Sequence, residues 1–278
     1  MRLQDTLVRM WQRVPLSWRA GLVNSRIAPY VRRLANLSYS SGPAVFPLAE
    51  PLKGYRMRLE WQSCKAFVFG TFEPEVARLL LQVIQPNWVV LDVGAHIGYF
   101  ALLLAKLVGP GGKVIAFEPC PGNFRTLEEN VRMNDCRNVV LEKRAAAATT
   151  GVMNLRSNDT GALTSTASLV HGQPMIDVET VCLDEYRSQL QEPIRFVMMD
   201  VEGAEAAVVQ GMRSFLRRDR PAVLIELHGF DSWGESHPAL QELQSMDYQF
   251  RFLEKEGCQV HVLAEPRKSR ADGGRAIS

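Results

Sequence analysis

The segment VVLDVGAHIGYFALLLAK, residues 89–106, constrains the fold more than any other part of the chain. It begins with the apolar, β-branched residues of a buried strand and ends with residues typical of a buried helix. Two glycines, Gly94 and Gly98, lie four positions apart between these parts. A strand joined to a helix by so short a turn predicts a βα unit of a parallel sheet, where ligands bind at the carboxyl ends of the strands.

The same alternation of strand and helix continues along the chain. Strands are predicted at KVIAFEP, NVVLEK, IRFVMMDVEG and PAVLIELHG, and helices at residues 123–133 and in AEAAVVQGM. The segments YQFRFL and QVHVL, separated by EKEG, predict an antiparallel hairpin. The fold class is therefore α/β, with a mostly parallel sheet covered by helices on both faces and a C-terminal antiparallel hairpin.

The residues before this alternation predict smaller elements. YRMRLEW alternates like an edge strand, and KAFVFG is expected to pair with it as a hairpin. EPEVARLLLQVI predicts a helix with a proline in its first turn. LSYSSGPAVFPLAEP, residues 37–51, is rich in Ser, Pro and Gly and is expected to form a linker or an irregular wrap.

The first 33 residues contain seven arginines and one acidic residue, and several apolar residues among them recur at helical spacing. They predict a basic amphipathic helix. Its apolar face can pack on the main domain, contact a membrane surface or another protein, or belong to a transit peptide. We therefore expect a basic N-terminal helical extension and linker at residues 1–50, one domain at 51–266, and a disordered polar tail at 267–278.

Composition and charge limit the classes of function. The formal net charge is +2, and the main domain carries no basic stripe with interleaved aromatics, so no nucleic-acid partner is expected. The five cysteines are scattered without metal-binding spacing, which is typical of reduced thiols in the cytoplasm. No apolar run approaches the length of about eighteen residues that a spanning helix needs. We expect a cytoplasmic protein, with a surface association with membranes left open.

The spacing of the glycine turn separates two kinds of nucleoside ligand. A pyrophosphate-binding turn has a second glycine two positions after the first, whereas this turn has Gly94 and Gly98. Asp92 precedes the turn, and a carboxylate there repels phosphates but suits an ammonium group. S-adenosylmethionine carries both an ammonium group and a nucleoside, and it is the ligand that these residues favour. His96, inside the turn, is expected to contact this cofactor or to form a buried hydrogen bond.

Glu118 ends the second strand, twenty-six positions after Asp92. A carboxylate near this offset accepts hydrogen bonds from the ribose hydroxyls in dinucleotide folds. Both S-adenosylmethionine and NAD(P) need such an acid, so Glu118 supports a nucleoside-bearing ligand without deciding between the two.

Five segments together resemble the FkbM-type S-adenosylmethionine-dependent methyltransferases. They are TFEPEV, VVLDVGAHIGYF, GKVIAFEPCPGNFRTLEENVRMN, MMDVEGAE and AVLIELH, which follow one another in the expected order between about residues 51 and 263. The resemblance implies a Rossmann-like class I methyltransferase domain. Its sheet has seven mostly parallel strands and ends in an antiparallel hairpin.

The resemblance also implies roles for individual residues. Asp92, Gly94 and Gly98 would form the loop on the methionine side of the cofactor, and Glu118 would bind the ribose. The remaining implied cofactor residues are Arg144 or Ala145, near the adenine, and Glu73, bordering the methionine end.

One residue departs from the family pattern. The family commonly has a lysine two residues before the aspartate of DVEG, whereas this chain has Met198. The departure implies either a specialised substrate pocket or a weaker activity.

Candidate catalytic residues follow the fourth and fifth strands of the alternation. Methyl transfer to a hydroxyl benefits from a base near the proton that leaves. Asp200 is the candidate base and Glu202 a residue that positions the acceptor, although Glu202 can instead cap the following helix. His228 is a second candidate base. No bound metal is expected, because the sequence places no third ligand, although Glu226 or His228 lies within reach of the pair.

These observations predict an S-adenosylmethionine-dependent methyltransferase that methylates a hydroxyl of a small molecule, sugar or lipid. Two alternatives stay open: an NAD(P)-dependent oxidoreductase, disfavoured by the glycine spacing, and a non-catalytic nucleoside-binding protein, favoured by Met198. The sequence identifies neither the acceptor nor the oligomeric state.

Overall fold

The computed structural model describes residues 42–156, 175–228, 236–256 and 259–267. The predicted basic helix before residue 42 and the predicted tail after residue 267 lie outside the described residues. Among the described residues no helix is both long enough and apolar enough to cross a lipid bilayer.

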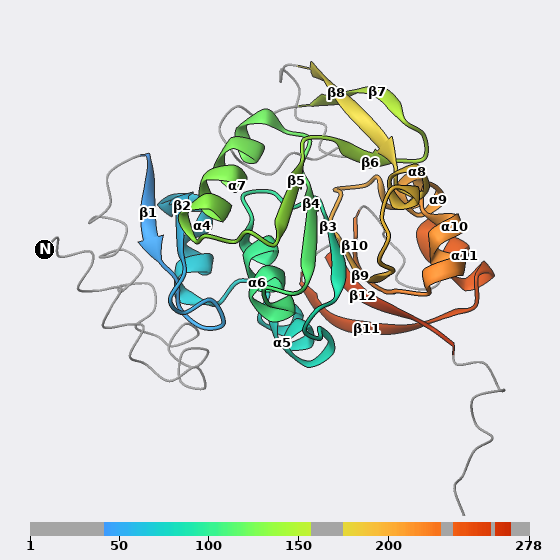
Figure 1. The fold of residues 1–278 in the computed structure, drawn as a ribbon, viewed down its shortest axis with the longest axis horizontal. Coiled ribbons are helices and arrows are strands. Elements are labelled where there is room, and N and C mark those ends of the chain that lie inside the picture. The colour runs from blue at the N-terminus through green and yellow to red at the C-terminus, as the bar shows by residue number, and fades with distance from the viewer. Residues whose placement is uncertain (1–41, 157–174, 229–235, 257–258, 268–278) are drawn as a thin grey trace, which may run out of the picture.

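A seven-stranded sheet forms the centre of the molecule, with the strand order β11-β12-β10-β9-β3-β4-β5 (Figure 1). Five neighbouring strands are parallel: β10 (Ala222–Leu227), β9 (Ile194–Met199), β3 (Val89–Val93), β4 (Lys113–Phe117) and β5 (Val139–Glu142). β12 (Gln259–Pro266) and β11 (Tyr248–Glu256) add an antiparallel hairpin at one edge. The predicted α/β fold with its C-terminal hairpin is confirmed.

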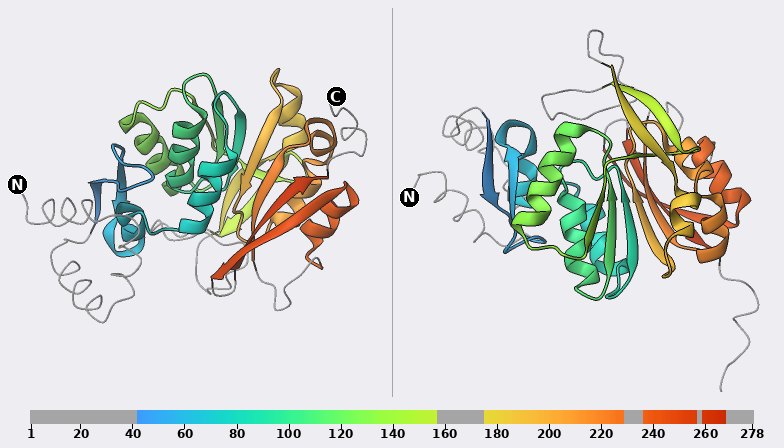
Figure 2. Two further views of the ribbon diagram at one scale, coloured as in Figure 1. Left: turned by 90° about the horizontal axis from the view of Figure 1, so that it is seen from below. Right: turned by 45° about the horizontal axis from the view of Figure 1, so that its top comes forward.

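Helices cover both faces of this sheet (Figures 1 and 2). One face packs against α5 (Pro74–Val83), α6 (Tyr99–Val108) and α7 (Pro121–Met133). The other packs against α8 (Leu183–Ser188), α9 (Glu205–Gln210), α10 (Arg213–Asp219) and α11 (Pro238–Ser245). Successive side chains of a strand point to opposite faces, so Val90 lies in the first core and Leu91 in the second. Burial on both faces explains why the strands are almost entirely apolar.

The predicted hairpin of YRMRLEW and KAFVFG is wrong. β2 (Arg56–Glu60) pairs instead with β1 (Pro43–Pro47), and Trp61–Phe69 form helix α4. Trp61 lies at the start of this helix and packs on Phe46, with ring centroids 5.3 Å apart. The short apolar run KAFVFG is compatible with either a strand or a helix, and packing against the rest of the fold selects the helix.

The segment expected as a linker is therefore partly structured. Residues 43–47 form β1, and Phe46 and Leu48 belong to the core beneath α4. Asn130 of α7 and Asn134, the residue after α7, anchor the paired strand β2: the backbone N–H of Arg58 donates to Asn130 Oδ1 (2.6 Å), and that of Arg56 donates to Asn134 Oδ1 (2.9 Å). The main body of the fold thus extends to residue 43 and not only to residue 51.

A second sheet, not predicted from the sequence, follows the carboxyl end of β5. It contains β6 (Ala145–Ala147), β8 (Met175–Cys182) and β7 (Gly151–Arg156), in that order. β7 and β8 are antiparallel and project from one end of the main sheet (Figure 1).

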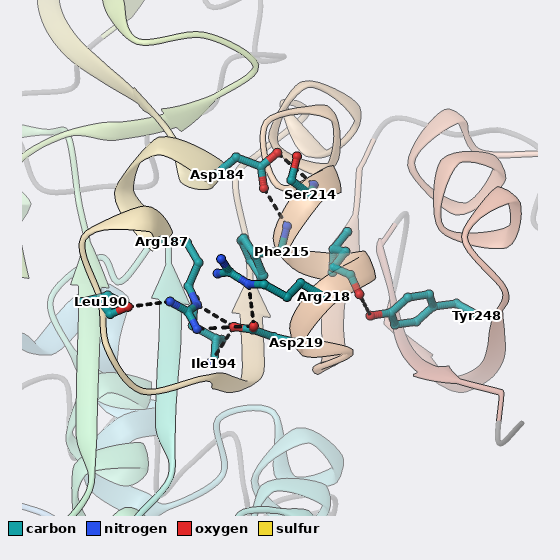
Figure 3. A network of polar contacts seen from close by, with 10 residues as sticks. Asp184, Arg187, Leu190, Ile194, Ser214, Phe215, Arg218, Asp219 and Tyr248 are labelled. Atoms are coloured by element: carbon teal, nitrogen blue, oxygen red, sulfur yellow. Dashed lines mark hydrogen bonds and ion pairs between the residues drawn. The ribbon is translucent and has the colours of Figure 1, made fainter.

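A buried ion pair joins α8, α10 and the start of β9 (Figure 3). The Arg187 guanidinium donates to both carboxylate oxygens of Asp219 and to the Leu190 carbonyl oxygen. Asp219 also accepts the backbone N–H of Ile194, the first residue of β9, at 2.9 Å. These bonds hold the amino end of β9 in place, and its carboxyl end leads to Asp200.

Asp184 caps α10 in the same region (Figure 3). Its carboxylate accepts the backbone N–H groups of Ser214 (2.9 Å) and Phe215 (2.8 Å), which have no partner inside the helix. The carboxylate thereby ties α8 to the amino end of α10.

Candidate functional site

The glycine turn after β3 lies against the end of β9. The N–H groups of Gly94 and Ala95 both donate to the Phe117 carbonyl oxygen at 2.9 Å, and the N–H of Asp200 donates to the Val93 carbonyl oxygen at 2.9 Å. Gly94 has φ 90°, and a β-carbon on it would lie 1.7 Å from the Asp200 carbonyl oxygen. Only glycine fits this position, so the first glycine of the motif brings two strand ends together.

The second glycine of the motif has a packing role. Gly98 precedes α6 with φ 96°, and a β-carbon there would lie 2.6 Å from Leu127 Cδ1 of α7. Gly98 does not line the cleft described below. Its predicted part in holding the cofactor stays a prediction.

Glu118 lies directly after β4 and is 5% exposed. Its Oε2 accepts the N–H of His96 (2.9 Å), and its Oε1 accepts the N–H of Cys120 (2.9 Å). Burial raises the pKa of Glu118 to about 7, although the backbone hydrogen bonds lower it. Asn123 Nδ2 is a third and longer contact, 3.5 Å from Oε1, and because a carboxylate has about four acceptor sites Glu118 retains capacity for a ligand hydroxyl.

Asp92 is the acid before the turn and is 3% exposed. Its Oδ2 atom is buried and has no hydrogen-bond partner among the described residues. Burial, followed by the charge of Glu118, raises the pKa of Asp92 to about 7. Its register partner on β9 is Met198, a buried residue of the same core. A buried carboxylate oxygen without a donor fits a ligand that carries donor groups.

A cleft of about 710 Å³, open to solvent, lies at the carboxyl ends of β3, β4, β5 and β9. Seven of the eleven predicted site residues line it: Gly94, His96, Glu118, Arg144, Ala145, Asp200 and Glu202. Glu73, Asp92, Gly98 and His228 do not line it. Met153 and Leu155 of β7 form part of its wall.

Arg144 is held at the rim of this cleft by its neighbours. Its guanidinium donates to Glu142 Oε2 from Nη2 (2.7 Å) and Nε (3.1 Å), and it lies 5.4 Å from the centre of the Tyr186 ring. The Tyr186 hydroxyl donates to the other oxygen of Glu142 at 2.8 Å. These contacts fix the orientation of Arg144.

His228, after β10, is surrounded by carboxylates. Its Nδ1 lies 2.8 Å from Glu205 Oε1, and its Nε2 lies 3.3 Å from Glu202 Oε2, 3.6 Å from Glu226 Oε1 and 3.7 Å from Asp200 Oδ1. Burial alone would lower the pKa of His228, but the hydrogen bond to Glu205 and the nearby charges raise it to about 9. The three predicted catalytic residues therefore belong to one cluster.

A second imidazole extends the cluster. His261 Nε2 lies 3.1 Å from Glu73 Oε2 and 3.4 Å from Glu226 Oε2. His261 and Glu226 are register partners on β12 and β10. Although burial opposes it, the contacts with both carboxylates raise the pKa of His261 to about 10.

The carboxylates of the cluster differ in their affinity for protons. Burial raises the pKa of Asp200 well above its usual range, and the charges of Glu226 and Glu202 raise it further. Burial also raises the pKa of Glu202. Burial raises the pKa of Glu226 too, but the two imidazoles outweigh it and lower this pKa overall. Among these acids, Asp200 has the pKa that burial and neighbouring charges raise most clearly, which makes it the strongest base of the group.

Three predicted site residues have left-handed backbone conformations, which are unfavourable for residues other than glycine. They are Glu73 (φ 38°), His96 (φ 50°) and Glu202 (φ 51°). Such conformations cost on the order of 1 kcal/mol or more each and cluster at functional sites. Asn87, Asp135, Arg220 and Asp247 also have positive φ and do not line the cleft, so the left-handed conformation is shared with turns elsewhere in the described residues.

Sequence reasoning missed Glu205 and His261 and treated Glu226 only as a residue within reach. Glu226 had a signal, because it lies near the end of β10 and two positions before His228, which follows that strand directly. Glu205 reaches His228 only through the turn at Gly203, and His261 reaches Glu226 only through the register of β12 against β10. Neither the turn nor the register is encoded by local spacing.

Parts of this chain are similar in sequence to known proteins. A model of the methyltransferase FkbM domain family matches residues 92–250. Hexuronic acid methyltransferase AglP of Haloferax volcanii is 27% identical over 210 residues, covering 73% of this chain and 83% of that protein.

Two further matches are shorter or more distant. Protein-L-isoaspartate O-methyltransferase of Aeropyrum pernix is 45% identical over 69 residues, which are 24% of this chain and only 26% of that protein. The crystal structure of methyltransferase FkbM from Methylobacillus flagellatus aligns with a TM-score of 0.43 and 17% identity, covering 89% of this chain and 60% of that one.

Proposed function

Because the chain belongs to the FkbM family of S-adenosylmethionine-dependent methyltransferases, we propose that it methylates a hydroxyl group of a sugar, lipid or other small molecule. One observation carries the proposal. Asp200 and Glu202 line the same cleft as Gly94, His96 and Glu118. A base and a nucleoside-binding acid in one cleft suit the transfer of a group from a nucleoside cofactor.

The described residues fit S-adenosylmethionine. Glu118 retains acceptor capacity for the ribose hydroxyls, and the unpartnered oxygen of Asp92 suits a donor group on the methionine side. We assign Gly94, His96 and Gly98 to the turn around the cofactor. Arg144 and Ala145 are assigned to the adenine end of the cleft, and Glu73 to the methionine side. When bound, the cofactor supplies a methyl group on a positively charged sulfur.

Asp200 is the group assigned to receive the proton of the acceptor hydroxyl. It lies on the cleft, and burial and the charges of Glu226 and Glu202 raise its pKa above that of an ordinary carboxyl, which makes it a stronger base. Glu202, also on the cleft, is assigned to hold the acceptor. His228 suits proton acceptance less well, because its pKa of about 9 keeps the imidazole protonated at neutral pH. As a cation, it balances the charges of the carboxylates around it.

The acceptor class rests on a relative. AglP is named a hexuronic acid methyltransferase, and the match covers 83% of its length. This supports a sugar as the acceptor of the present protein.

The test is methyl transfer by the full-length chain to a panel of acceptors. The panel contains neutral sugars, hexuronic acids, lipid alcohols and matched amines, and products are identified by mass spectrometry. We expect one added methyl group on a hydroxyl, with neutral sugars or hexuronic acids as the best acceptors. Methylation of the amines without the hydroxyls, or transfer to no member of the panel, would overturn the proposal.

A further inference from the structure

Two groups of potential metal ligands share one residue. Asp200, Glu226 and His228 form one group, and Glu73, Glu226 and His261 form the other. Within each group, one ligand atom from each residue lies within 4.8 Å of the others. Carboxylate oxygens and imidazole nitrogens are common ligands of divalent cations.

The orientation of His228 matches that of a metal-binding histidine. Its Nδ1 contacts Glu205 Oε1 at 2.8 Å, and the same oxygen accepts the backbone N–H of Gly203 at 2.9 Å. Glu205 is only 1% exposed, so its position is fixed. Histidines that bind metals usually donate their second ring N–H to a carboxylate in this way. The contact turns Nε2 towards Asp200 and Glu226.

The spacing within the first group leaves room for an ion. The His228 Nε2 atom lies 3.6 Å from Glu226 Oε1 and 3.7 Å from Asp200 Oδ1, beyond the usual length of a hydrogen bond, while Glu202 Oε2 lies nearer to it, at 3.3 Å. Neighbouring ligands of one octahedral ion lie about 3 Å apart, so a small inward shift of these side chains would bring them into its coordination shell. Asp200 Oδ1 is buried and has no hydrogen-bond partner among the described residues. In the second group, His261 contacts Glu73 at 3.1 Å, which a direct ion pair explains.

The charge of the cluster also favours a cation. Five carboxylates surround the two imidazoles: Glu73, Asp200, Glu202, Glu205 and Glu226. When the carboxylates are ionised, the cluster stays negative even with both imidazoles protonated. A divalent cation in place of the His228 proton would reduce this excess.

We propose that Asp200, Glu226 and His228 bind one divalent cation, with Mn²⁺ as the representative ion, at the edge of the cofactor cleft. Three protein ligands leave coordination positions open for a substrate oxygen. Asp200 also lines the cleft, which places the first group, and not the second, next to the proposed acceptor.

This proposal rests on the proposed function and modifies the part of Asp200 in it. The cation polarises the acceptor hydroxyl and eases the loss of its proton. The proton passes to Glu202, while the acceptor oxygen forms its bond to the methyl carbon and the bond from that carbon to sulfur breaks. Asp200 then acts as a ligand and not as the direct base.

The test is Mn²⁺ binding by the full-length chain after treatment with a chelator. Free Mn²⁺ is followed by electron paramagnetic resonance, with neither cofactor nor acceptor present. We expect one saturable site per chain. Glu226→Gln and His228→Gln should each weaken it about tenfold or more. His261→Gln, which alters only the second group, and Glu129→Gln, on the exposed side of α7, should retain it.

Several outcomes overturn the proposal. They are the absence of saturable binding by the wild-type chain, equal binding by Glu226→Gln, and loss in His261→Gln with retention in His228→Gln. Circular dichroism and thermal unfolding of each variant identify any loss of binding that comes from unfolding. His228→Asn serves as a second variant if His228→Gln does not fold.

Methyl transfer with and without a chelator separates this proposal from the proposed function. Undiminished transfer in chelator, together with no Mn²⁺ binding, overturns the cation site and leaves the methyltransferase activity in place. Saturable Mn²⁺ binding that responds to His228→Gln, without transfer to any hydroxyl, supports the cation site and overturns the proposed function.

Discussion

Gly94 lies so close to Asp200 that a β-carbon on residue 94 would stand 1.7 Å from the Asp200 carbonyl oxygen. The contact links the turn expected to hold the cofactor to the strand end that carries the proposed catalytic acid. This single backbone contact therefore fixes the position of the cofactor turn relative to the proposed catalytic acid.

Replacing Gly94 with Ala should destabilise the fold and impair cofactor binding. The new methyl group would collide with backbone, which cannot move aside as a flexible side chain can, and φ 90° strains any L-residue. We expect a loss of about 2 to 4 kcal/mol in the free energy of unfolding, measured by urea denaturation. Gly122→Ala is the matched control, because a β-carbon there meets nothing within 4 Å. Equal stability of the two variants would refute the close contact.

Glu118→Gln should weaken binding of S-adenosylhomocysteine, the stable product of the cofactor. The change removes the charge that strengthens hydrogen bonds from the ribose hydroxyls. A hydrogen bond to a charged group contributes about 1.5 to 3 kcal/mol, so we expect about ten- to hundredfold weaker binding by calorimetry. Glu128→Gln, exposed on the same helix that follows Glu118, should bind as the wild type does. Unchanged affinity in Glu118→Gln would remove Glu118 from the site.

Cofactor affinity should fall as the pH drops below 7. Burial raises the pKa values of Asp92 and Glu118 to about 7, above their ordinary values, so both carboxyls take up protons as the pH falls through that value. Only the ionised forms bind ammonium and hydroxyl donors with charge assistance. From pH 8 to pH 5.5 we expect a loss of about tenfold or more in the affinity for S-adenosylhomocysteine. A flat calorimetric profile over this range would show that neither carboxylate binds the ligand.

A lysine at position 198 should be tolerated better than one at position 199. Met198 is the register partner of Asp92, whose buried Oδ2 has no partner among the described residues, whereas Met199 faces the opposite, apolar core. The family resemblance places a lysine at position 198, where it would pair with Asp92. We expect Met198→Lys to be at least about 1 kcal/mol more stable than Met199→Lys in urea denaturation at pH 8. The reverse order would show that Asp92 is not available to the new charge.

Much of the fold follows from residue patterns. The buried strand at residues 89–93, the glycine turn and the terminal hairpin were predictable because continuous apolar strands and turn residues are local signals. Helix α4 was not, since its apolar residues suit a strand equally well and packing on Phe46 decides the outcome. The alternating residues of β8 are a local signal, but the sheet of β6, β7 and β8 was missed because the pairing of β8 with the other two strands depends on long-range register.

The site was predictable to the extent that strand ends converge. Gly94, Glu118 and Asp200 come from three strands of a parallel sheet, and topology alone places their positions at one edge. The contacts of Glu205 and His261 depend on turn geometry and strand register, which form only when the whole sheet assembles. The spacing of residues in the sequence predicts neither the turn geometry nor the strand register.

The most direct test of the account is the rate of methyl transfer by Asp200→Asn at saturating cofactor and acceptor. Asn preserves the size of the side chain but can neither accept a proton nor carry the charge needed at this position. We expect the rate to fall about a hundredfold or more, while calorimetry shows unchanged binding of S-adenosylhomocysteine. A rate equal to that of the wild-type chain would contradict the role assigned to Asp200 and, with it, the proposed site of methyl transfer.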